Sequence, residues 1–125
     1  MEATVNDIIK VMDGIAPPNL AEPWDNVGLL VGRSSNTVKK LMVALDVSPE
    51  VVEQAVEHKV QMLVTHHPLI FGGMKQINNR DFIGRRLLQL LGNDISYYAM
   101  HTNFDAAPGC MADLAGERLG LKDTR

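Results

Sequence analysis

The sequence has one cysteine, no long apolar run and no cluster of basic residues. Because Cys110 is the single cysteine, no disulfide can form within the chain. The longest apolar runs, such as Val27 to Val31, are too short to cross a bilayer, which excludes a membrane-spanning segment. The 12 lysines and arginines are scattered and the net charge is -3, so a surface that binds nucleic acid is not expected.

The amino-terminal residues lack the features of a leader sequence. Met1 and Glu2 are followed by neither a basic segment nor an apolar one, as a signal peptide would require. Together with the lone cysteine, this predicts a cytoplasmic protein. Apolar residues make up 46% of the chain and charged residues 22%, and no linker, repeat or low-complexity stretch divides it. Residues 1–125 are therefore predicted to form one α/β domain.

Apolar spacing and turn residues predict the order of the elements. The predicted elements are a helix at 4–14, an extended loop at 17–23, strands at 27–31 and 41–45, a helix at 48–59, a strand at 62–64, a long loop at 68–80, a helix at 82–92, a strand at 95–100 and a helix at 108–119. Right-handed crossovers through helices make strands two, three and four parallel, while strand one is the odd, antiparallel member. The prediction is an α-β-(βα)3 unit with a mixed four-stranded sheet and helices on both faces.

Histidines follow two of the predicted strands. His66 and His67 come directly after the third strand, and Pro68 keeps His67 out of a helix and out of the hydrogen-bond ladder. Taken alone, such a pair could simply cap a strand at the surface. His101, however, follows the fourth strand, and the carboxyl ends of parallel strands meet at one edge of a sheet.

Carboxylates are expected at the same edge. Asp46 ends the second strand, and Asp105 lies four residues after His101. Imidazole nitrogen and carboxylate oxygen together form the ligand set of zinc, manganese or iron. Two adjacent histidines that point to different sides can also serve two neighbouring ions. The arrangement therefore favours a divalent metal site over a surface cap.

Three other residues have alternative interpretations. Cys110 and His101 could be imagined as a nucleophile and its base, but a cysteine among apolar neighbours is more often a small buried residue. Trp24 is expected to anchor its loop against the following strand rather than to bind a substrate. Asp25 either caps an element or supports a ligating histidine through a hydrogen bond, and both interpretations stay open.

Three motifs match a known family. They read Glu22-Pro23-Trp24-Asp25-Asn26-Val27-Gly28-Leu29, Thr65-His66-His67-Pro68-Leu69-Ile70-Phe71 and His101-Thr102-Asn103-Phe104-Asp105-Ala106-Ala107-Pro108-Gly109. In this order they resemble the N-terminal half of the GTP cyclohydrolase I type 2 homologues, also called the NGG-interacting-factor-three-like family. The resemblance covers essentially the whole chain.

The resemblance implies two intertwined α/β repeats around a dinuclear metal centre, often assembled into a toroidal hexamer. It implies that His66 and His67 bind the two different ions, that Asp105 is a further ligand, and that His101 is a ligand or its neighbour. Family members add a histidine and a bridging glutamate from a C-terminal repeat, and nothing after Gly120 provides them. The chain is thus expected to be one repeat with an incomplete metal site.

Two functions follow as hypotheses. The first is a metal-dependent hydrolase, in which a water made acidic by the ion attacks a small, nucleotide-like substrate. The alternative is a non-catalytic interaction or regulatory module that retains the metal motifs. An unpaired sheet edge and apolar faces at 27–31 and 87–91 also predict a homo-oligomer, from a dimer to a larger closed ring.

Overall fold

The computed structural model describes residues 2–122 and has one mixed four-stranded sheet. Its elements are α1 (Val5–Ile15), the 3-10 turn η1 (Pro18–Leu20), β1 (Gly28–Val31), β2 (Leu41–Ala44), α2 (Pro49–Glu57), β3 (Met62–Thr65), α3 (Phe82–Gly92), β4 (Ser96–Ala99), α4 (Thr102–Ala106) and α5 (Met111–Arg118). The strand order is β1-β4-β3-β2, with β2, β3 and β4 parallel and β1 antiparallel to β4. This confirms the predicted α/β fold and strand directions.

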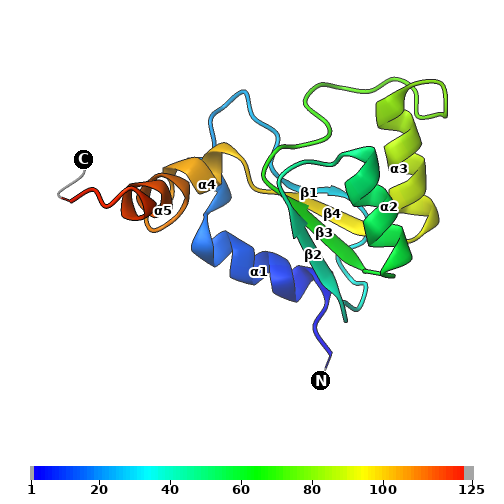
Figure 1. Cartoon of the computed structure of the whole chain (residues 1–125). Coiled ribbons are helices and arrows are strands. Elements are labelled where there is room, and N and C mark those ends of the chain that lie inside the picture. Colours follow the sequence, from blue (N-terminus) through cyan, green and yellow to red (C-terminus); the bar gives the residue numbers. More distant parts are fainter. Residues whose placement is uncertain (1, 123–125) are drawn as a thin grey trace.

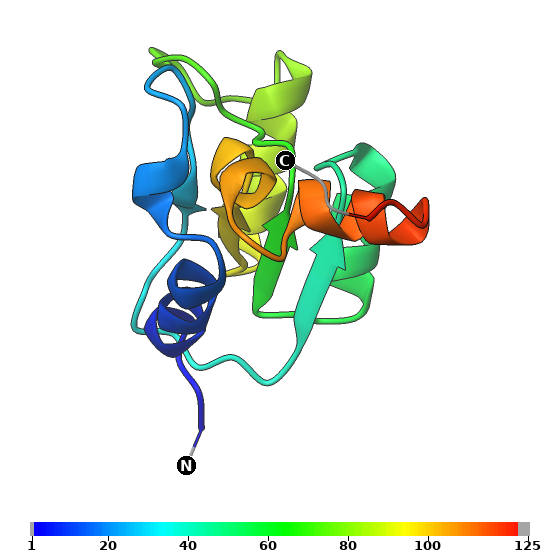
Figure 2. The same ribbon diagram turned by 90° about the vertical axis from the view of Figure 1, so that its left-hand side faces the viewer.

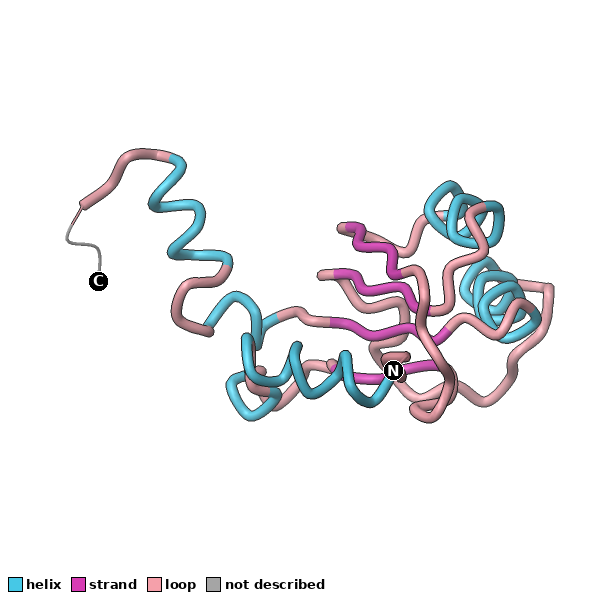
Figure 3. Tube along the Cα trace, turned by 90° about the horizontal axis from the view of Figure 1, so that it is seen from below, coloured by secondary structure: helices cyan, strands magenta, loops and turns pink. Residues whose placement is uncertain are grey.

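The two central strands are buried on both faces, because helices cover the sheet from both sides (Figure 1). Side chains alternate along a strand, so Leu63 and Tyr97 pack on the side of α2 and α3. Met62, Val64 and Tyr98 pack on the opposite side, against α1. The sheet thus lies between two apolar layers. Figure 3 shows helices on either side of the strands.

Local capping explains where the first helices begin. Thr4 and Asp7 form a reciprocal capping box at the start of α1, in which each side chain accepts from the other residue's amide. The Ser48 hydroxyl accepts from the Val51 amide at the start of α2, where Pro49 occupies the first helical position. Both starts agree with the sequence prediction.

The structure differs from the prediction at three places. The segment after His101 forms the short helix α4, which the sequence analysis missed. The last helix begins at Met111 rather than at Pro108, and it projects away from the sheet (Figure 3). The 17–23 loop is not fully extended, because η1 forms within it. A five-residue helix has too few apolar positions to produce a periodic signal, which explains the first miss.

Candidate metal centre

Three histidines lie together at the carboxyl edge of the sheet. Strands β3 and β4 are neighbours, with Thr65 opposite Ala99, so His66 and His101 follow adjacent strand ends. The ring centroids of His66 and His67 are 4.9 Å apart, and those of His66 and His101 are 5.0 Å apart. One ring nitrogen from each of the three lies within 4.8 Å of the others. The three side chains could therefore hold a metal ion.

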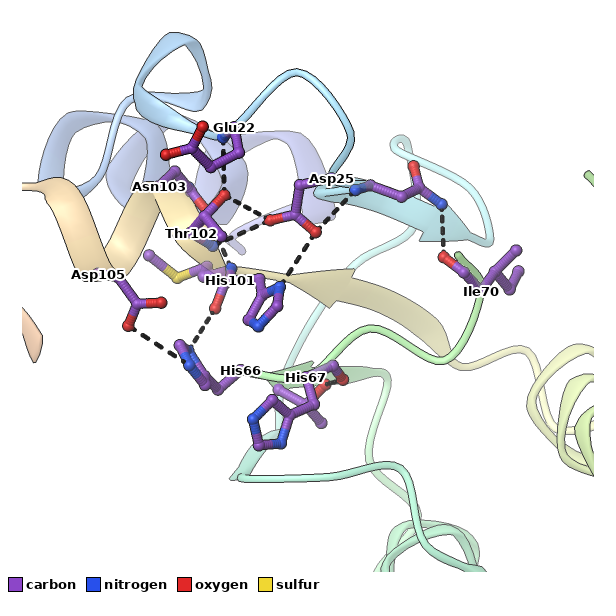
Figure 4. Close-up of polar contacts among 12 residues, drawn as sticks. Glu22, Asp25, His66, His67, Ile70, His101, Thr102, Asn103 and Asp105 are labelled. Carbon is purple, nitrogen blue, oxygen red and sulfur yellow. Dashed lines mark hydrogen bonds and ion pairs between the residues drawn. The ribbon is translucent and has the colours of Figure 1, made fainter. Parts of the chain in front are cut away.

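Hydrogen bonding fixes the orientation of the His66 ring. Its Nδ1 lies 2.9 Å from the carbonyl oxygen of Met100. A carbonyl can only accept, so Nδ1 carries the hydrogen and donates it. The lone pair is then on Nε2, which faces the Asp105 carboxylate at 3.6 Å (Figure 4).

The distance between His66 Nε2 and Asp105 Oδ1 provides a test of whether a metal fits. At 3.6 Å it is too long for a hydrogen bond, and with the proton on Nδ1 both atoms are acceptors. Two ligands of one tetrahedral zinc ion, each bound at about 2.0–2.2 Å, lie roughly 3.3–3.6 Å apart. A nitrogen and a carboxylate oxygen at this separation fit a shared cation.

Carboxylates orient the other two histidines. Asp46 accepts a hydrogen bond of 2.5 Å from Nδ1 of His67. Asp25 accepts one of 3.0 Å from Nδ1 of His101 (Figure 4). In both residues Nε2 is left with the lone pair. Metal-binding histidines are commonly held in this way, with the second ring nitrogen donating to a carboxylate or a carbonyl.

Asp25 reaches His101 because β1 pairs antiparallel with β4, which places the residues before β1 beside those after β4. Its carboxylate accepts from the Thr102 hydroxyl at 2.6 Å, from the Thr102 amide at 3.0 Å and from the Asn26 amide at 2.9 Å. Burial acts to raise the pKa of Asp25, but the bonds from Thr102, His101 and Asn26 outweigh it and lower the pKa to about 2. Asp25 is therefore a fixed negative charge beside His101.

Two buried hydroxyls hold the backbone beneath the histidines. The Thr65 hydroxyl donates to the carbonyl of His67 at 2.9 Å, and it lies 2.7 Å from the hydroxyl of Tyr97. Tyr97 in turn accepts from the Leu69 amide at 3.2 Å. The segment that carries His67 is thus anchored to the core.

Residues 3–125 match the protein family described as Duf34/NIF3 (NGG1p interacting factor 3). This chain belongs to the Duf34/NIF3 family. It is 41% identical over 117 residues to a "GTP cyclohydrolase 1 type 2 homolog" of Clostridium perfringens, covering 94% of this chain and 45% of that relative. It is 37% identical to the protein of the same name from Bacillus subtilis, covering 99% of this chain and 34% of the relative. The chain thus spans less than half the length of these curated relatives.

Solved structures agree with the family assignment. A Bacillus cereus protein related to NIF3 superposes with a TM-score of 0.94 at 36% identity, covering 99% of this chain and 34% of that one. The reduced HcgD of Methanocaldococcus jannaschii superposes with a TM-score of 0.92 at 33% identity, covering all of this chain and 50% of that one. Both comparisons confirm the α/β fold. Within residues 2–122, no helix is long and apolar enough to span a membrane.

Three of the residues that the sequence singled out for metal binding form one cluster, and two carboxylates each lie against one of these histidines. His66, His67 and His101 form the cluster; Asp105 faces His66, and Asp46 contacts His67. Asp25 makes the contacts of both roles left open in the sequence, because it accepts from the Thr102 amide at the start of α4 and from the His101 ring. Sequence analysis missed Thr102 and Tyr97, whose roles depend on partners far away in the chain.

The solvent exposure of Trp24 and of Cys110 tests the interpretations given to these two residues. Trp24 was expected to anchor its loop, but its side chain is largely exposed, so that prediction is wrong. Cys110 is buried, as predicted for a small core residue, and its Sγ lies near the carbonyl of Ile15. Burial raises the pKa of Cys110, which disfavours the thiolate that a nucleophile needs.

Proposed function

We propose that this chain binds divalent metal through His66, His67, His101 and Asp105, and that the centre serves the hydrolysis of a small, nucleotide-like substrate. The observation that supports it is the common orientation of the histidines. Each Nδ1 faces an oxygen acceptor, which leaves the Nε2 lone pairs of all three free to bind a cation. Imidazole and carboxylate donors favour zinc, manganese or iron.

The two adjacent histidines lie against different carboxylates. This arrangement is consistent with a site that binds two ions. His66 faces Asp105, whereas His67 contacts Asp46. The family resemblance implies that a second repeat adds a histidine and a bridging glutamate to such a centre. We therefore propose that the four donors described here form one part of a dinuclear site.

A bound divalent ion would make a water molecule acidic and would polarise a carbonyl or phosphoryl group of the substrate. The protein's part is to hold the donors in place. Asp25 and Asp46 fix the imidazole planes of His101 and His67, and the Met100 carbonyl fixes that of His66. Rings held in this way lose little conformational freedom when a ligand binds.

Metal analysis tests the binding step. Protein purified without chelator should contain zinc, manganese or iron, and the double variant His66→Ala, His67→Ala should contain at least tenfold less. His58→Ala is the matched control, because His58 lies at the end of α2, away from the cluster. Equal metal content in the double variant and the wild type would reject the proposed centre.

A hydrolysis assay separates this proposal from the second candidate, a binding module without catalysis. The second is favoured by the apolar side chains that β2 leaves exposed at the sheet edge. The metal-loaded chain and the longer Clostridium perfringens relative should both be incubated with a panel of nucleotides and phosphoesters. Metal-dependent turnover by this chain alone would reject the binding-module hypothesis. Metal binding without turnover in either protein would reject the hydrolase.

A further inference from the structure

Two exposed aromatic side chains flank the histidine cluster. Trp24 is 63% exposed and Phe71 is 55% exposed. Each meets His101 edge-on, with ring centroids 6.2 Å apart for Trp24 and 6.0 Å apart for Phe71. An exposed indole and phenyl ring at one polar site is unusual, because large aromatic side chains gain most of their stabilisation from burial.

The loops that carry these two rings are bonded to each other and to the site. Asn26 Nδ2 donates to the carbonyl of Ile70 at 2.7 Å, joining the loop of Trp24 to that of Phe71. The Asp25 amide closes a turn around Trp24 by donating to the Glu22 carbonyl at 3.0 Å. Figure 2 shows the two loops side by side at the carboxyl edge of the sheet. The rings are therefore positioned by backbone that is already fixed.

The remaining exposed phenylalanine, Phe82, differs in its surroundings. The guanidinium of Arg86 lies 5.3 Å from its ring centroid, so a cation covers one face. Among residues 2–122, the aromatic contacts of Trp24 and Phe71 are with His101 alone. More than half of each side chain therefore remains accessible to a ligand.

We propose that Trp24 and Phe71 bind the flat heteroaromatic ring of a ligand, such as a nucleobase, whose polar atoms reach the histidines. This rests on the proposed metal centre and names the part of the substrate that the protein itself recognises. Aromatic faces bind any planar base by stacking, whereas sugars and linear phosphoesters offer no such face. The carboxylates of Asp25, Asp46 and Asp105 surround the histidines, so the protein part of the site attracts a neutral ring better than an anion.

Trp24 is the single tryptophan of the chain, so its fluorescence reports on this site directly. Guanosine and adenosine should each quench the emission of the zinc-loaded protein in a saturable manner, and ribose should not. Phe71→Ala should weaken nucleoside binding by roughly 5- to 100-fold, the range seen when one stacking ring is removed. Phe82→Ala, an exposed phenylalanine replaced in the same way, should bind like the wild type.

Further measurements make the outcome decisive. Trp24→Ala should weaken nucleoside binding in equilibrium dialysis by roughly 5- to 100-fold as well, while Trp24→Phe, which keeps a ring, should weaken it less. Zinc content should match the wild type in every variant, because none of these residues is a proposed ligand. Normal zinc content without nucleoside binding would overturn the aromatic site but leave the metal centre standing, whereas a wild-type protein that binds none of zinc, manganese and iron would overturn the metal centre and the aromatic site that rests on it. Emission typical of a buried indole that becomes exposed on dilution would also overturn the proposal, because a second copy would then cover Trp24.

Discussion

Asp25 is the residue on which the position of His101 depends. Its side chain is 0% exposed, and its carboxylate accepts from the His101 ring as well as from Thr102 and Asn26. An acid held by several donors is stabilised in its charged form. The same bonds therefore support the fold and keep the hydrogen of His101 on Nδ1.

We predict that Asp25 contributes stability at neutral pH that disappears in acid. Its folded-state pKa of about 2 lies below the ordinary value of 3.8, so the contribution is complete above about pH 4 and is lost as the pH falls towards 2. Its size should be on the order of 1–2 kcal/mol. Urea unfolding from pH 7 to pH 2 should show that Asp25→Asn is less stable than the wild type at pH 7 and that the difference shrinks in acid. A difference that is constant across this range would contradict the prediction.

The antiparallel pairing of β1 with β4 brings Asp25 close to His101. Gly32 directly follows β1 and has a φ of 108°, a conformation that residues with a side chain rarely adopt. A Cβ added at Gly32 would lie 2.6 Å from the Cα of Ser96, at the start of β4. The close approach of the two backbones therefore requires glycine at this position.

We predict that Gly32→Ala destabilises the protein by roughly 2–4 kcal/mol, through backbone strain and the clash with Ser96. Gly92→Ala is the matched control, because an added Cβ there meets nothing within 4 Å. At the end of α3 that substitution should be neutral or should stabilise by about 0.5 kcal/mol. Equilibrium unfolding in urea measures both, and equal stability of the two variants would contradict the argument.

At the scale of the whole molecule, the edge strand β2 leaves one apolar row open. Leu41, Val43 and Leu45 alternate along it, and Val43 is 71% exposed. Of the two faces named from the sequence, segment 27–31 is half-buried or buried, whereas segment 87–91 keeps Leu88 and Leu91 exposed. The apolar row of β2 lies at the edge of the sheet opposite β1. An unpaired strand with an apolar row is a surface on which another chain can pair.

We predict that the chain self-associates through this edge and that Val43→Asp shifts it towards the monomer. Sedimentation at low micromolar concentration should show a dimer or larger closed assembly for the wild type, because association buries the apolar row. Leu119→Asp, at the exposed end of α5 and outside both apolar faces named from the sequence, is the control and should leave the assembly unchanged. A compact wild-type monomer that melts cooperatively would contradict the prediction.

The sequence by itself determined the strands, the longer helices and the edge of the sheet at which the histidines lie. Capping at Thr4 and Ser48, the strand periodicity and the histidines after β3 and β4 are signals that act over a few residues, so they can be read locally. The parallel crossovers then required His66, His67 and His101 to meet at one edge. The histidine cluster was predictable to that extent.

Only the tertiary structure decided how the cluster is supported and what surrounds it. Asp25 and His101 are 76 residues apart, and their bond exists because β1 turns antiparallel to β4. The exposure of Trp24 likewise depends on how its loop lies beside Phe71, which no local pattern encodes. Contacts between distant segments depend on how the whole chain packs. The free energy that stabilises them comes from many core residues, so the sequence around the contacting residues does not reveal them.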